Sequence, residues 1–202
     1  MELTYGNQTI DLFGKEHFPD GPPEKVVVSL SGGCDSSSLT YLIGTNFPDI
    51  DMYPFHTKDE DCPIDTERAI EVHQWLQNKF PKLHDLKIYT VSTSDPVWQA
   101  KAKEAMASPK GSVVVNGKKV SMWGTLNGAS KALQNRDKRS KMSLQYDAPV
   151  VMAMTSNPPV DVQKERGFYE VAERKRDPGE SKLKVMDTID KGGLTYQPYL
   201  RN

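Results

Sequence analysis

The segment SLSGGCDSSSL, residues 29–39, combines two glycines, one aspartate and five serines. Glycine lets the backbone adopt conformations that other residues avoid and lets backbone amides approach a ligand closely. Serine hydroxyls add hydrogen-bond donors and acceptors. These groups suit a bound anion, so the segment predicts a phosphate-binding loop. The competing interpretation is a flexible serine-rich turn.

The residues around this segment favour the phosphate loop. Val26–Leu30 form a short, β-branched, apolar run that predicts a buried strand. Residues 36–44 predict a helix that begins on serine caps. A helix N-terminus carries partial positive charge and backbone N–H groups that point at a ligand. The order strand, loop, helix therefore predicts an anion-binding cradle.

The two commonest phosphate-binding motifs are absent. A Walker loop ends in glycine, lysine and a hydroxyl residue, and a dinucleotide fingerprint reads G-x-G-x-x-G. Neither pattern occurs in residues 29–39. If the segment binds phosphate, it therefore belongs to another class of phosphate site.

Ser31 to Ser37 read S-G-G-x-D-S-S directly after the predicted strand. This pattern resembles the PP-loop of the N-type ATP pyrophosphatases, the adenine nucleotide alpha hydrolase-like superfamily. That superfamily includes GMP, asparagine and NAD synthetases, tRNA-modifying ligases and thiolases, and the 7-cyano-7-deazaguanine synthases.

The resemblance implies an ATP-dependent ligase or adenylyltransferase that uses ATP and Mg²⁺. Such an enzyme adenylates a substrate, releases pyrophosphate, and drives amidation, nitrile formation or thiolation of a small molecule or nucleobase. Deazaguanine-type modification is one route among several. Preorganised donors would stabilise the charge that builds on the leaving pyrophosphate.

The resemblance also implies roles for the loop residues. It makes Asp35 and Ser36 the catalytic candidates, and Asp35 the candidate for assisting Mg²⁺. The nucleotide-binding candidates of the loop are Ser29, Leu30, Ser31, Gly32, Gly33, Asp35, Ser36 and Ser37.

Further nucleotide-binding candidates lie outside the loop. In the superfamily the end of the second strand lies against adenine, which here implies His56 and Thr57. Thr155 and Asn157 lie where a later predicted strand runs into a loop, a position at which relatives place nucleotide or substrate contacts. Arg136 belongs to a basic segment, NRDKRSK, that could bind phosphates or an anionic substrate. The alternatives are a plain strand end, helix capping and a solvated helix end.

Two other polar features have simple structural interpretations. The acidic segment 58–62 could hold a metal ion, although a solvated loop is the commoner role. Cys34 occupies the variable position of the loop, where we expect a small filler residue and no persulfide chemistry.

The remaining sequence alternates predicted strands and helices. This alternation predicts a three-layer α/β fold, with a mainly parallel sheet covered by helices on both faces. Pro54 predicts that its strand lies at an edge or ends there. Ligands bind such folds at the carboxyl ends of the strands. The predicted strands are 50–57, 86–91 and 148–157, the helices are 65–80, 96–107, 125–136 and 160–175, and residues 112–120 read as an inserted β-hairpin.

The predicted domain organisation has three parts. Residues 1–25 form a lead-in segment, either a short hairpin or a loose stretch. Residues 26–180 form the nucleotide-binding α/β domain, and residues 181–202 form a tail with little periodicity. The resemblance implies that the α/β domain is of the HUP type. The final residues, TYQPYLRN, read like the start of a further element, which suggests a compact, truncated or partner-dependent version of the family.

Composition excludes several classes of function. The 202 residues carry 26 basic and 27 acidic side chains, so the net charge of −1 does not indicate nucleic-acid or membrane binding. Two cysteines make neither a disulfide framework nor a four-cysteine zinc site. We find no secretory signal and no membrane-spanning run, so the expected location is cytoplasmic.

Two alternative functions stay open at the level of sequence. One is an enzyme similar to the sulfonucleotide (PAPS) reductases, although no cysteine follows residue 62. The other is a non-catalytic nucleotide-binding subunit of a split enzyme. A homodimer or a partner subunit is compatible with each of these functions.

Overall fold

The computed structural model describes the backbone of residues 2–5, 8–15, 17–60, 63–107, 112–115, 118–121, 125–155, 182–186, 193–197 and 199–200. Side chains are described for residues 12–15, 17–60, 64–107 and 125–153.

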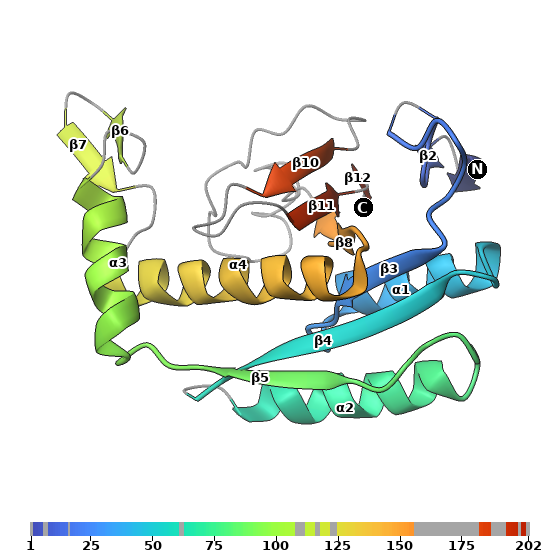
Figure 1. Cartoon of the computed structure of the whole chain (residues 1–202), viewed down its shortest axis with the longest axis horizontal. Helices are drawn as coiled ribbons and strands as arrows, with labels where there is room; N and C mark the ends of the chain where they lie inside the picture. Colours follow the sequence, from blue (N-terminus) through green and yellow to red (C-terminus); the bar gives the residue numbers. More distant parts are fainter. Residues whose placement is uncertain are drawn as a thin grey trace, which may run out of the picture.

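A six-stranded sheet forms the centre of the molecule (Figure 1). Its strands lie in the order β10-β11-β8-β3-β4-β5, and all are parallel to their neighbours except β10, which is antiparallel to β11. The bounds are β3 Lys25–Ser29, β4 Asp51–Asp59, β5 Lys87–Val91, β8 Val150–Val151, β10 Lys182–Met186 and β11 Gly193–Gln197.

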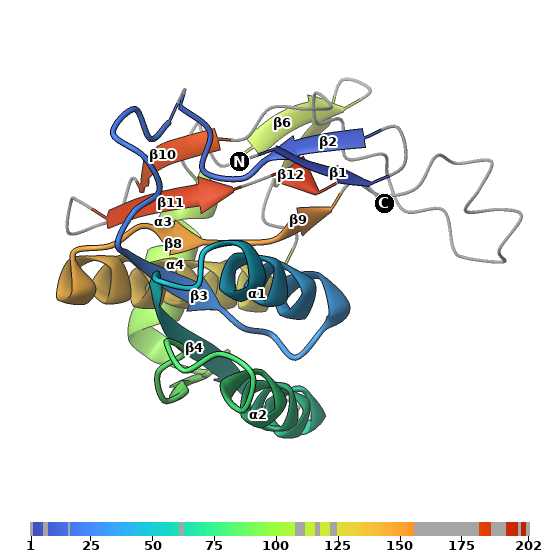
Figure 2. The same ribbon diagram turned by 90° about the vertical axis from the view of Figure 1, so that its right-hand side faces the viewer.

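Helices cover both faces of this sheet, so the predicted three-layer α/β fold is confirmed. Helices α1 (Cys34–Asn46) and α2 (Pro63–Gln77) lie on one face, and α4 (Leu126–Tyr146) lies on the other (Figure 2). Helix α3 (Pro96–Ala107) packs against α4.

Alternate residues of β3 supply the two halves of the core. Val26 and Val28 pack with apolar residues of α1 and α2, whereas Val27 packs with Met142 of α4. This alternation follows from the two-residue period of a strand. Because both faces are covered, the strand reads as a continuous apolar run.

The chain order places the serine-glycine loop at a topological switch point. From β3 the chain passes through α1 to β4 and through α2 to β5, moving toward one edge of the sheet. It then returns through α3 and α4 to β8, on the opposite side of β3. In open α/β sheets, ligands bind outside the carboxyl ends of the strands at such a reversal. The loop after β3 lies at this position.

Several local predictions are confirmed. Helix α3 has the predicted bounds, and Asp95 Oδ1 accepts hydrogen bonds from the N–H groups of Val97 (2.9 Å) and Trp98 (3.2 Å). The inserted hairpin is present as antiparallel strands β6 (Ser112–Val115) and β7 (Lys118–Ser121).

The prediction that Pro54 marks an edge strand or a strand end is wrong. Strand β4 lies between β3 and β5, and Pro54 is in its interior. The N–H of Met52, two residues earlier, points toward the β5 side of β4. There it donates to the carbonyl of Lys82, in the segment that leads into β5. Pro54 therefore directs its missing N–H to the same side, just before the β4–β5 ladder begins at Phe55. No ladder hydrogen bond is lost there.

The two terminal segments contain more strands than a loose chain would. The first residues form a hairpin of β1 (Glu2–Tyr5) and β2 (Gln8–Asp11), which agrees with the first of the two alternatives for the lead-in segment. The predicted strand 148–157 divides into β8 and β9 (Met154–Thr155), and β9 pairs with β12 (Tyr199–Leu200). The tail, predicted to have little regular structure, supplies β10 and β11 to the central sheet. The predicted helix 160–175 lies outside the described residues.

Among the described residues, no helix has both the length and the apolar character needed to cross a bilayer.

Candidate functional site

The loop after β3 is held in shape by its own serine hydroxyls. Ser36 is buried, and its Oγ accepts a hydrogen bond from the Ser31 N–H at 3.0 Å and donates one to the Gly33 carbonyl at 3.3 Å. Because a hydroxyl has one proton, Ser31 Oγ must be the donor in its 3.0 Å contact with Ser36 Oγ. Ser31 Oγ also accepts from the Gly33 N–H at 3.3 Å. These bonds make Ser31 and Ser36 the residues that organise the loop.

The N-terminus of α1 presents backbone donors to the carboxyl edge of the sheet. Gly33 is the N-cap residue, and it has no side chain that could cap the helix. Ser37 N–H bonds back to the Gly33 carbonyl at 3.2 Å, whereas earlier first-turn donors such as the N–H groups of Cys34 and Ser36 precede the first helical acceptor. The helix start differs from the predicted serine caps. It leaves donors and a positive dipole end for an anion.

Gly32 lets the loop press against the backbone of α2. Its φ of +78° lies in the left-handed region, and an added Cβ would lie 2.7 Å from the Ala69 nitrogen and 3.0 Å from the Arg68 carbonyl carbon. Glycine is therefore required at this position by both conformation and space. At Gly33 an added Cβ would meet only Ser31 Oγ, at 3.4 Å.

His56 supports the loop from the neighbouring strand. The imidazole is buried, with Nδ1 at 2.9 Å from the Leu30 carbonyl and Nε2 at 3.1 Å from Thr66 Oγ1 of α2. A carbonyl only accepts, so Nδ1 carries a proton, and in the neutral imidazole Nε2 accepts from the Thr66 hydroxyl. Both ring nitrogens thus have protein partners, and the predicted nucleotide contact of His56 does not involve them in this arrangement. Thr57 is half-buried one residue further along β4.

Helix α4 brings two arginines to the opposite side of the switch point. Arg139 donates from Nε to the Asn135 carbonyl at 3.1 Å and from Nη1 to the Met152 sulfur at 2.8 Å. Burial, and secondarily the charge of Arg136, lower the pKa of Arg139. Met152 directly follows β8, so this guanidinium lies near the strand end beside the loop. The sequence singled out Arg136; the three-residue spacing to Arg139 on one helix face is the signal that could have paired them.

The lysines of the same basic segment have acidic partners. Lys141 Nζ lies 2.9 Å from Asp137 Oδ2, and Lys138 lies 4.0 Å from the same oxygen. In the acidic segment 58–62, Asp59 forms an ion pair with Lys131. These pairs compensate the lysine charges and leave the arginine pair as the distinctive cationic feature of α4.

Gln134 ties α4 to the carboxyl end of β5. Its Oε1 accepts from the Ser92 N–H at 3.2 Å, and its Nε2 donates to the Ser92 carbonyl at 2.7 Å. Ser92 follows the last residue of β5, so this side chain continues the hydrogen bonding of the sheet into the helix layer.

Replacing Gln134 with methionine should lower the free energy of unfolding by about 2 kcal/mol, because both backbone groups of Ser92 lose their partner. Urea denaturation measures the change, with Gln145→Met, an exposed position on the same helix, as the matched control. Equal midpoints for the two variants would show that the Gln134 bonds do not stabilise the fold.

The metal prediction rests on one carboxylate. Asp35 is exposed in the first turn of α1. Among the described residues, no group of three or more His, Cys, Asp or Glu side chains is arranged to hold a metal ion. Magnesium commonly uses one or two carboxylates together with substrate phosphates and water. A single carboxylate beside a phosphate loop fits that mode.

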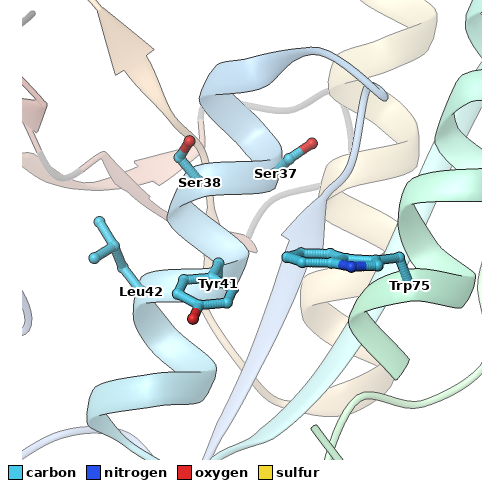
Figure 3. A pocket seen from close by; sticks show the side chains of 5 residues that line it. All are labelled: Ser37, Ser38, Tyr41, Leu42 and Trp75. Carbon is cyan, nitrogen blue, oxygen red and sulfur yellow. The ribbon is translucent and has the colours of Figure 1, made fainter. Parts of the chain in front are cut away.

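A pocket of about 400 Å³ lies along the outer side of α1, facing α2 (Figure 3). It is lined by Ser37, Ser38, Tyr41, Leu42 and Trp75. The Tyr41 and Trp75 rings are stacked, with centroids 5.8 Å apart. None of the lining residues is charged, so the pocket lacks the cationic groups typical of a phosphate site.

The remaining predicted residues are placed as follows. Cys34 is exposed at the first position of α1, with its sulfur 3.8 Å from Ser38 Oγ. The backbone of Thr155 pairs with Leu200 in the small β9–β12 sheet. Asn157 lies outside the described residues. The structure thus brings the loop and His56 together and places the arginines across the strand ends from them.

A scan against protein-family models and a search of curated proteins found no match to this chain.

Proposed function

We propose that this chain binds Mg-ATP in the loop 31–37 and cleaves it between the α- and β-phosphates, transferring AMP to an acceptor. The observation that carries the proposal is the S-G-G-x-D-S-S sequence on a loop at the switch point, with the donors of a helix N-terminus beside it. In this proposal the fold is of the adenine nucleotide alpha hydrolase-like, HUP type.

The loop would act on the leaving group. The first-turn N–H groups and the positive end of α1 would bind the pyrophosphate and stabilise the charge that develops on it. Ser31 and Ser36 would keep those donors in place through the bonds between their hydroxyls. Because the loop is organised before ATP binds, little reorganisation would accompany the chemical step.

Asp35 would hold the Mg²⁺ that accompanies ATP, and that ion would neutralise charge on the phosphates. Thr57, Arg136, Thr155 and Asn157 are proposed nucleotide contacts. His56 would act as a positioning residue, because its ring bonds the Leu30 carbonyl at the start of the loop.

The acceptor would receive AMP and then react with a nitrogen or sulfur nucleophile. Amidation, nitrile formation and thiolation each fit this sequence of steps, and modification of a deazaguanine-type base is one instance. In open α/β sheets the ligand crevice lies at the carboxyl ends of the strands, so a second substrate would enter there beside the nucleotide.

Isothermal titration calorimetry with Mg-ATP, Mg-pyrophosphate and adenosine tests the proposal. Both phosphate ligands should bind more tightly than adenosine, and Asp35→Ala should weaken Mg-ATP binding by about tenfold, equivalent to about 1.4 kcal/mol. Asp49→Ala, an exposed aspartate beyond the end of α1, is the matched control and should bind like the parent. Unchanged Mg-ATP affinity in Asp35→Ala would contradict the assigned role of Asp35, and absence of Mg-ATP binding by the parent would overturn the proposal.

A further inference from the structure

Arg139 is a partly buried cation whose described partners are neutral. Its Nε bonds a backbone carbonyl and its Nη1 bonds the Met152 thioether, a weak acceptor. Among the described side chains, no carboxylate forms an ion pair with Arg139 or Arg136, since Asp137 pairs with Lys138 and Lys141 and Asp59 pairs with Lys131. The guanidinium therefore has donors that neutral groups satisfy only in part.

The positive charge of Arg136 makes burial of the Arg139 guanidinium still less favourable. Arg136 lies three residues before Arg139, so the two side chains emerge from the same side of the helix. Burial and the positive charge of Arg136 both lower the pKa of Arg139. A bound anion would compensate the two charges and occupy guanidinium donors that a thioether fills poorly.

Arg136 and Arg139 lie on the side of the strand ends opposite the loop, where both could contact one bound ligand. Met152 follows Val151, and Val151 is in register with Val28 of β3, so the Arg139 contact lies level with Ser29. Met152 packs with the apolar cluster that contains Met142 of α4, whereas the loop leads into α1 on the opposite face. The arginines and the loop therefore approach the strand ends from opposite faces of the sheet.

We propose that Arg136 and Arg139 form a second oxyanion site, distinct from the loop, which binds a phosphate or carboxylate group through the guanidinium forks. The existence of this site does not depend on ATP chemistry, but its role in the reaction rests on the proposed function. In an in-line displacement the attacking and leaving oxygens lie on opposite sides of phosphorus. In this proposal, an oxyanion held on the α4 face would approach phosphorus from the side opposite the pyrophosphate held on the α1 face.

Arginine side-chain NMR tests the site directly. Inorganic phosphate is titrated into ¹⁵N-labelled protein while the Nε–H signals are followed, and Arg139→Met assigns the Arg139 signal. Because the loop can also bind phosphate, this signal is a more specific readout than overall affinity. We expect the Arg139 signal to move in a saturable manner. A signal that stays in place at phosphate concentrations far above physiological levels would overturn the proposal.

Thermal unfolding separates an anion site from a structural arginine. Phosphate should raise the Tm of the parent and of Lys103→Met, which removes one exposed cation from α3, more than it raises the Tm of Arg139→Met. Without phosphate, Arg139→Met should be at least as stable as the parent, because a poorly compensated charge is removed. A lower Tm for Arg139→Met together with an unchanged response to phosphate would show that the role is structural.

Two further titrations identify the source of the oxyanion. If AMP moves the Arg139 signal at lower concentration than phosphate does, the site holds the nucleotide α-phosphoryl group. If acetate moves the signal in the presence of saturating Mg-ATP, the site holds an acceptor carboxylate. Phosphate binding at Arg139 in a chain that does not bind Mg-ATP would leave this site standing while the proposed function failed, and the reverse result would remove only the site.

Discussion

Gly32→Ala is expected to lower the free energy of unfolding by about 3 kcal/mol, whereas Gly33→Ala should change it little. Left-handed backbone costs a residue with a Cβ about 1–2 kcal/mol. The added Cβ would also lie 2.7 Å from the Ala69 nitrogen, which belongs to the backbone of α2 and cannot move without shifting the helix. Forcing an extra carbon into a packed site costs about 1–3 kcal/mol more.

Urea denaturation of both variants measures this difference, and calorimetry measures Mg-ATP binding. Gly33 has a φ of −83° and room for a Cβ, so Gly33→Ala controls for the loss of a loop glycine as such. We expect Gly32→Ala to lose Mg-ATP binding even under conditions where it remains folded, because the loop must move away from α2. Equal stability of the two alanine variants would contradict the described packing of the loop on α2.

His56→Phe is expected to destabilise the chain by about 2–3 kcal/mol. The substitution leaves the buried Leu30 carbonyl and the Thr66 hydroxyl without their imidazole partner, and each buried group left unpaired costs about 1–3 kcal/mol. It should also weaken Mg-ATP binding, because Leu30 begins the loop. Thr66→Val breaks only the second bond, so its stability loss should be nearer 1 kcal/mol, with Mg-ATP affinity close to that of the parent.

A double-mutant cycle of His56→Phe and Thr66→Val separates the two bonds. The combined variant should be less destabilised than the sum of the single variants, because they share the interaction between Nε2 and Thr66. Full additivity of the two losses would show that this bond contributes nothing. An unchanged Mg-ATP affinity in His56→Phe would show that the Leu30 bond does not position the loop.

The sequence predicts those parts of the fold that local signals determine. The apolar run Val26–Val28, the glycines after it and the helix that follows are adjacent in the chain, so their order predicts the loop. Asp95 and Pro96 predict the start of α3 for the same reason, because capping involves residues within one turn.

The remaining features depend on contacts between distant residues. The resemblance implied a nucleotide contact for His56, and its bond to the Leu30 carbonyl follows only when β4 lies beside β3. Pro54 argues against a central strand, and its position is explained only by the β4–β5 ladder, which begins one residue later at Phe55. Strand β11 has no local pattern that identifies β8 as its neighbour. In the sequence Arg139 is one of several cations of a basic segment. The structure distinguishes it, because Lys138 and Lys141 pair with Asp137.

Product analysis with ATP labelled at the α-phosphate shows which phosphate bond this chain cleaves. The parent chain is incubated with Mg²⁺, labelled ATP and pools of candidate acceptors, and the labelled products are separated, with Asp35→Ala as the inactive comparison. We expect label in AMP or in an adenylated acceptor, together with an equal amount of pyrophosphate. Label in ADP together with released inorganic phosphate would place the cleavage between the β- and γ-phosphates and would overturn the proposed function.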